Sequence, residues 1–182
     1  MKSIILGIDP GLAFTGYAII SYQKPHFELL TIGTLELGKT EKDTYEKLSL
    51  IYQRLTHFIT AYQVNAFAIE SPFYGKNIQI AIKMGRTQGV CIAAALAYQI
   101  PVFDYAPRKV KQSVTGKGSA SKEMVAGMLQ NIFKTSFDEH FLDATDALAV
   151  AVCHAFQAQP PSKNISSWKN FIEHHPDRIK KL

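Results

Sequence analysis

One carboxylate interrupts an apolar stretch near the start of the chain. The segment IILGIDPGLAFTGYAII, residues 4–20, has a single charged side chain, Asp9, between an apolar run and a Pro-Gly turn. The run before Asp9 is typical of a β-strand that is buried on both faces. A carboxylate at the end of such a strand is costly to remove from water unless another group compensates its charge. The sequence therefore predicts a strand over residues 4–9 that ends at a charged site.

The order of the remaining elements predicts a single mixed α/β domain. Further strands are expected near 16–22, 27–36, 65–70 and 100–105, and helices near 43–63, 78–99, 107–114, 120–132 and 137–157. Ser136 and Glu139 form a capping-box pattern that predicts the start of the last helix. Beyond this helix the pattern dissolves into Pro, Ser, Asn and charge. We therefore expect a domain over residues 1–158 and a C-terminal tail over 159–182, to which no function is assigned.

The bulk composition is that of a globular protein rather than a disordered or membrane protein. Apolar residues make up 47% of the 182 residues and charged residues 19%. No apolar stretch approaches the ~20 residues that a membrane helix needs, and the N-terminus lacks the pattern of a signal peptide. Cys91 and Cys153 lie in apolar, helix-like segments. Two such cysteines indicate reduced, packed thiols and a cytoplasmic location.

Four acidic residues occur where predicted elements begin or end. Asp9 and Glu70 end apolar strands, and Asp143 and Asp146 lie in the first turns of the last helix, about 60° apart around its axis. If these elements meet, the four carboxylates converge and need cations, and hard oxygen ligands select Mg²⁺ or Mn²⁺. Two such ions are the standard device for phosphodiester cleavage. The alternative is that each acid caps its own helix or turn.

Basic residues are concentrated in the middle of the chain. Between residues 71 and 122 there are eight Lys or Arg and one acid, Asp104. Such a block favours a polyanionic partner such as nucleic acid, and a solvated surface is the alternative. The segment PRKVKQSVTGKGSASK, residues 107–122, does not have the spacing of a phosphate-binding Walker A loop. It is nevertheless suited to contact with DNA phosphates.

The loop SPFYGKN, residues 71–77, places two aromatic side chains directly after Glu70. Phe73 and Tyr74 are suited to stacking on an unpaired base, and Lys76 adds a positive charge. The alternative is that both rings fold back into the core. Gly85, Gly89 and Ala93 recur every four residues in the long helix, a spacing that allows close approach of another element. That element is either the protein's own sheet or a second copy of the chain.

These segments together resemble the RuvC family of bacterial Holliday junction resolvases. The resemblance rests on ILGIDPGLAFTGYAII, FAIESPFYGKN, IPVFDYAPRKVKQSVTGKGSASK and DATDALAVAVCHA, in order along residues 1–158. It implies a ribonuclease H-like fold with a mixed five-stranded sheet flanked by helices. It also implies a homodimer that binds four-way junction DNA and makes paired, symmetric nicks during recombination and repair.

The resemblance also implies roles for individual residues. The catalytic and metal-binding acids of the family correspond to Asp9, Glu70, Asp143 and Asp146, with Mg²⁺ (or Mn²⁺), two ions per subunit, as cofactor. Some relatives have histidine at the position of Asp146. The family's base-contacting Phe falls on Phe73 and its functional lysines on Lys111 and Lys122. Tyr74, Lys76, Arg86 and Arg108 are further expected DNA contacts, and the branch-migration motor RuvA–RuvB is an expected partner.

Three other functions share part of these sequence features. An ATP-handling protein of the actin and sugar-kinase type also begins with an Asp-x-Gly hairpin, but it needs two such domains and a second glycine loop. A junction-binding protein that no longer cuts would not need all four acids. A ribonuclease H-like nuclease acting on RNA or on simple DNA ends would not need the aromatic and basic loops in this order. The junction nuclease therefore remains the favoured interpretation.

Overall fold

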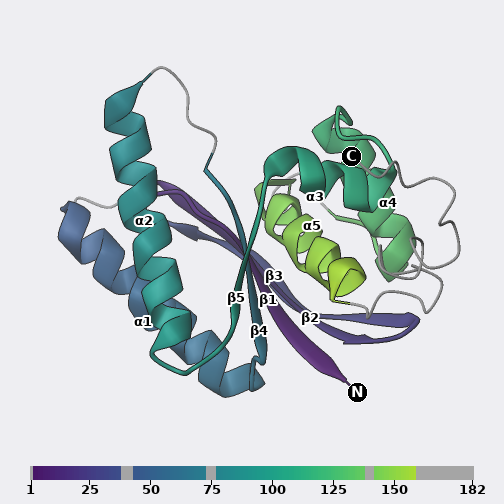
Figure 1. The fold of residues 1–182 in the computed structure, drawn as a ribbon, viewed down its shortest axis with the longest axis horizontal. Helices are drawn as coiled ribbons and strands as arrows, with labels where there is room; N and C mark the ends of the chain where they lie inside the picture. Colours follow the sequence, from purple (N-terminus) through teal and green to yellow (C-terminus); the bar gives the residue numbers. More distant parts are fainter. Residues whose placement is uncertain (1, 38–42, 73–76, 138–141, 159–182) are drawn as a thin grey trace, which may run out of the picture.

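The computed structural model describes residues 2–37, 43–72, 77–137 and 142–158, and it leaves the side chains of 142 and 143 undescribed. The structure forms five strands and five helices within these ranges (Figure 1). Their bounds are β1 Ser3–Asp9, β2 Phe14–Gln23, β3 His26–Glu36, α1 Thr44–Tyr62, β4 Ala66–Glu70, α2 Ile78–Leu96, β5 Val102–Tyr105, α3 Pro107–Thr115, α4 Lys122–Phe133 and α5 Leu142–Gln157. No helix in this part of the chain is long and apolar enough to cross a lipid bilayer.

The strands form one mixed sheet in the order β3-β2-β1-β4-β5. Strands β1, β2 and β3 are antiparallel neighbours, whereas β1, β4 and β5 run parallel. Ile8 of β1 pairs with Ile69 of β4, one residue before each strand ends in an acid. Because parallel strands end at the same edge of a sheet, Asp9 and Glu70 lie side by side.

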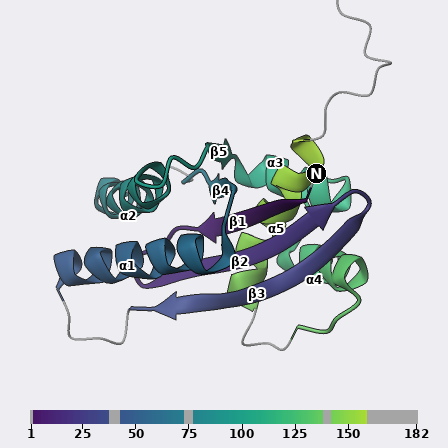
Figure 2. The same cartoon turned by 90° about the horizontal axis from the view of Figure 1, so that it is seen from below.

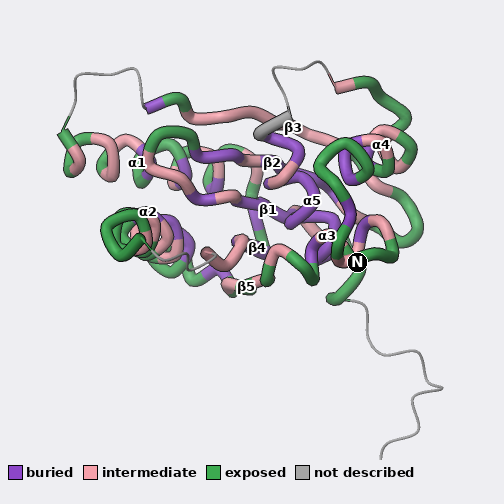
Figure 3. The backbone as a smooth tube through the Cα atoms, turned by 90° about the horizontal axis from the view of Figure 1, so that it is seen from above, coloured by how far each residue is buried: buried purple, intermediate pink, exposed green. Residues whose placement is uncertain are grey.

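Helices cover both faces of the sheet, as Figures 1 and 2 show. Alternate residues of β1 divide between the two cores: Leu6 and Ile8 pack with α1 and α2, and Ile5 packs with α3, α4 and α5. In Figure 3 the central strands and α5 are the most deeply buried parts of the fold. The mixed α/β domain expected from the sequence is therefore confirmed.

Local sequence signals account for most helix ends. Asp43, Asn77 and Ser121 accept hydrogen bonds from backbone N–H groups in the first turns of α1, α2 and α4. The expected start of the last helix at 137 is wrong, because Ser136 and Phe137 are not helical. Phe137 packs against the hydrophobic core instead, and α5 begins at Leu142.

We predict that the cap of α4 stabilises the fold by about 1 kcal/mol. Ser121 Oγ accepts the N–H of Met124 at 3.3 Å, so Ser121→Ala leaves that donor without its cap. Urea denaturation should show the free energy of unfolding lowered by this amount. Ser119→Ala, at an exposed position in the preceding loop, is the control and should change it by less than about 0.5 kcal/mol. Equal effects of the two substitutions would contradict the capping role.

Candidate active site

Three carboxylates from distant parts of the sequence line one cavity. Asp9 ends β1, Glu70 ends β4, and Asp146 lies near the start of α5. The cavity has a volume of about 340 Å³, and Lys111 of α3 and Lys122 of α4 also line it. All three acids are half-buried. The sheet and the helices above it thus place negative and positive side chains around the same space.

Asp143 lies in the same helix as Asp146, one turn earlier. A separation of three residues puts two positions on neighbouring parts of a helix surface. The side chain of Asp143 lies outside the described residues, so its role remains a prediction. Phe73, Tyr74 and Lys76 also lie outside the described residues, in the segment between β4 and α2.

Glu70 is the acid most strongly affected by this environment. Burial first, and then the nearby charges of Asp9 and Asp146, raise the pKa of Glu70 to about 8, against the opposing effect of Lys122 and Lys111. A carboxyl group with this pKa holds a proton at neutral pH. The cavity therefore has more negative groups than it can keep ionised without additional positive charge.

Lys122 provides part of that positive charge directly. Its Nζ lies 2.6 Å from Oδ2 of Asp146, within hydrogen-bond distance, although the lysine side chain is 60% exposed. Lys122 is the first residue of α4, so the Ser121 cap also fixes the backbone that carries it. The sequence pointed to Lys122 as a DNA contact, and the structure also places it in an ion pair inside the acidic cavity.

The chemistry of these donors fits a hard divalent cation. Carboxylate oxygens are the ligands that Mg²⁺ and Mn²⁺ prefer. Although Asp9, Glu70 and Asp146 share a cavity, no three His, Cys, Asp or Glu side chains in the described ranges are grouped closely enough to form a ready-made metal site. Carboxylates that share a cavity repel one another, and a cation is the group that would draw their oxygens together.

The other predicted DNA contacts fall into two places. Arg108 is at the start of α3, where its side chain packs over Gly118 beside the acidic cavity, and Lys111 lies one turn later. Arg86 is exposed on α2, which covers the opposite face of the sheet. The structure therefore brings Arg108, Lys111 and Lys122 near the acids and leaves Arg86 on another layer.

One residue that the sequence interpretation missed is Thr15. Its side chain is fully buried, and its Oγ1 donates a hydrogen bond to the backbone oxygen of Gly11 at 2.5 Å. This bond ties the turn after Asp9 to the start of β2. A threonine in a strand is common for packing reasons alone, so the sequence contained no signal for this role.

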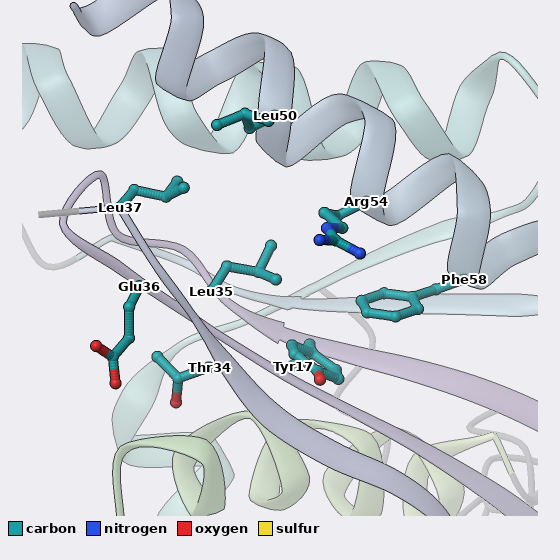
Figure 4. A pocket seen from close by; sticks show the side chains of 8 residues that line it. All are labelled: Tyr17, Thr34, Leu35, Glu36, Leu37, Leu50, Arg54 and Phe58. Atoms are coloured by element: carbon teal, nitrogen blue, oxygen red, sulfur yellow. The ribbon is translucent and has the colours of Figure 1, made fainter. Parts of the chain in front are cut away.

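A larger cavity lies between β2, β3 and α1, away from Asp9, Glu70 and Asp146 (Figure 4). Its volume is about 460 Å³, and its lining includes Tyr17, Glu36, Arg54 and Phe58. It belongs to the face that α1 and α2 cover, whereas the acidic cavity is lined by residues of α3, α4 and α5. Size alone therefore does not identify the site in this fold.

Comparison with known proteins shows the family to which this chain is similar. The family described as "Crossover junction endodeoxyribonuclease RuvC" matches residues 5–154. A protein of that name from Cytophaga hutchinsonii is 48% identical, over 97% of this chain and 88% of its own length. Another, from Porphyromonas gingivalis, is 43% identical over 98% of each chain.

Solved structures agree with the assignment of the fold. The T. thermophilus RuvC structure in complex with a Holliday junction substrate superposes with a TM-score of 0.78 and 29% identity, over 86% of this chain and 94% of that chain. The yeast mitochondrial Holliday junction resolvase Ydc2 has a TM-score of 0.64 at 15% identity, over 84% and 78% of the two chains, and supports the fold alone. The mixed sheet is thus the ribonuclease H-like sheet of these nucleases. The chain belongs to the RuvC family of crossover junction endodeoxyribonucleases.

Proposed function

We propose that this protein resolves Holliday junctions by hydrolysing phosphodiester bonds at the cavity formed by β1, β4 and α5. The observation that carries this proposal is the meeting of Asp9, Glu70 and Asp146 with two lysines in one cavity. The relatives that share the fold are named crossover junction endodeoxyribonucleases, and one is in complex with a Holliday junction substrate. The four-way DNA junction is accordingly the substrate assigned to this chain.

Nucleases of the RuvC family are metal-dependent. We further propose which residues bind the metal and how many ions they hold. Asp9, Glu70, Asp143 and Asp146 hold Mg²⁺ or Mn²⁺, two ions per chain. Such ions, when bound, lower the pKa of water and offset the negative charge of the phosphate. Glu70 is protonated near neutral pH without such ions, and it would lose its proton to solvent in order to hold one.

The basic residues then hold the DNA. Lys111 and Lys122 line the acidic cavity, where an ammonium group stabilises the charge that develops on the scissile phosphate. Arg108 lies beside them and contacts a neighbouring phosphate, and Arg86 contacts DNA from α2. Phe73, Tyr74 and Lys76 follow Glu70 in the sequence and engage the bases and backbone at the junction's exchange point.

We predict that the acids are required for cutting but not for binding. Asp9→Asn should lower the rate of cutting a synthetic four-way junction in Mg²⁺ at least about 100-fold, because the amide cannot replace a charged ligand. Junction binding measured with a chelator present should be unchanged or tighter, because one negative charge near the DNA is removed. Asp146→Asn and Asp143→Asn are tested in the same way.

A matched control for these variants is Asp104→Asn. Asp104 is an exposed carboxylate on β5 that accepts a hydrogen bond from Gln88 at 3.2 Å and does not line the acidic cavity. Its substitution should leave the cutting rate within about twofold of the wild type, a difference of less than ~0.5 kcal/mol. If Asp9→Asn cut as fast as this control, the metal-site proposal would be wrong.

We predict a pH-dependent stability that originates in Glu70. Its pKa rises from 4.5 to about 8 on folding, so the folded protein binds more protons than the unfolded chain between these values. The free energy of unfolding, measured by urea denaturation with a chelator present, should therefore fall as the pH rises from about 5 to 8. Glu70→Gln should flatten this decline and unfold at higher urea than the wild type at pH 8. An equal decline in both proteins would contradict it.

The homodimer is proposed from an exposed stripe along α2. Ile82, Gly85 and Gly89 recur at helical spacing, and all are exposed. An added Cβ at either glycine would meet no atom within 4 Å, so these glycines are not required for seating α2 on the protein's own sheet. Ile78 and Leu96 extend the stripe, with 73% and 59% of their surfaces exposed. A two-fold pair of chains joined along this stripe would bury it and supply two identical sites.

We predict that Ile82→Glu weakens this dimer about 100-fold, or ~2.7 kcal/mol, because it places a charge in an apolar contact. Sedimentation velocity over a concentration series measures the dissociation constant. Tyr45→Glu, which replaces an exposed aromatic residue on α1, is the control and should leave it unchanged. A wild type that sediments as a monomer throughout would contradict the proposal. Cytoplasmic location is proposed from the buried free thiols of Cys91 and Cys153, and cooperation with RuvA and RuvB from the family resemblance.

A further inference from the structure

Helix α5 lies unusually close to the strand that ends in Asp9. A Cβ atom built on Gly7 of β1 would overlap the backbone oxygen of Ala147 and lie 2.8 Å from both Cβ and N of Ala151. Real Cβ atoms do not approach other atoms so closely, so glycine is required at this position for α5 to lie where it does. Two of these three atoms belong to the main chain of α5 and the third is a Cβ atom, so none can rotate away as the end of a long side chain can.

Gly7 is the middle of a row of small residues that crosses three strands. In the sheet register it pairs with Ala18 of β2 and with Ala68 of β4. Ala18 and Ala68 are fully buried and belong to the core cluster that contains α5. We name the row Ala18–Gly7–Ala68 the small-residue platform. Helix α5 rests on it through Ala147 and Ala151, which are also fully buried.

The platform lies next to the acids in the sequence of each element. Gly7 precedes Asp9 by two residues on β1, and Ala68 precedes Glu70 by two residues on β4. Ala147, whose backbone oxygen meets Gly7, directly follows Asp146 on α5. The contacts that set the spacing between α5 and the two strands therefore lie, in the sequence, within two residues or one helical turn of each carboxylate.

We infer that the small-residue platform is a positioning device that sets the depth at which α5 rests on the sheet and so the spacing of the carboxylates. The inference rests on the proposed function, in which these carboxylates hold the divalent cations. Gly7 acts through Asp9 and Asp146 and is a positioning residue, not a catalytic one. A methyl group at Gly7 would push α5 outward by a distance on the order of 1 Å, enough to cost about 100-fold in rate when reacting groups are misplaced.

The test measures metal binding directly, with Mn²⁺ as the probe and no DNA present. We expect Gly7→Ala to weaken Mn²⁺ binding, followed by electron paramagnetic resonance, at least about 10-fold. Cutting of a four-way junction in Mg²⁺ should fall about 100-fold, whereas junction affinity in a chelator should stay within about twofold. The matched control is Gly127→Ala in α4, where an added Cβ meets nothing within 4 Å. It should leave Mn²⁺ binding unchanged.

A double variant separates positioning from general damage to the fold. Gly7→Ala with Ala151→Gly removes the single methyl contact among the three close contacts of the new Cβ, so it should recover part of the lost Mn²⁺ affinity. It is also measured in place of Gly7→Ala if the single variant does not fold. The inference is overturned if the folded variants bind Mn²⁺ as the wild type does. A wild type that binds no Mn²⁺ overturns the metal site itself, and the inference with it.

Discussion

Repulsion between half-buried carboxylates is the constraint on which the rest of this site depends. Two such charges ~4 Å apart repel by about 4 kcal/mol at an effective dielectric constant of 20. The parallel pairing of β1 with β4 nevertheless places Asp9 beside Glu70, and α5 adds Asp146 to the same cavity. Burial and this repulsion together raise the pKa of Glu70, and the close ion pair between Lys122 and Asp146 offsets part of the repulsion. A proton on Glu70 and the ammonium group of Lys122 each reduce the negative charge in the cavity. A bound divalent cation would reduce it further.

The acids of the site lie on rigid elements of the fold, whereas the lysines reach the site with flexible side chains. The acids are carried by the central strands and by α5, where buried residues on both sides hold the backbone in place. The lysines are carried by α3 and α4, which pack above α5, and they reach the cavity with long side chains. A metal site needs fixed ligands, whereas phosphate groups of a deformable DNA junction are contacted well by flexible cations. The proposed roles of the acids as metal ligands and of the lysines as phosphate contacts follow that distinction.

The acids at the strand ends could be predicted from the sequence. Other features of the site could not, for physical reasons. A lone acid at the end of an apolar run identifies Asp9 and Glu70, because few other positions combine burial with charge. The ion pair of Lys122 with Asp146 could not be predicted, because it joins residues 24 apart across two helices whose packing no local pattern specifies. The same holds for Gly7, since a glycine within a strand does not reveal which backbone approaches it. The predicted start of α5 was wrong because Phe137 packs against the hydrophobic core and is not helical. This is a tertiary contact that a capping pattern cannot show.

The acidic cavity cannot by itself explain a preference for four-way junctions. Its carboxylates and lysines address a phosphodiester, and every DNA carries phosphodiesters in the same chemical form. Selection of a branched substrate must therefore come from shape, and shape is read by the distance and orientation between separate contacts. A pair of chains joined along the exposed stripe of α2 would fix two cavities at one separation and relate them by two-fold symmetry. A four-way junction has that symmetry and an unbranched duplex with one scissile bond does not need it. The helix that covers the face opposite the acids would then determine which DNA the acids can cut.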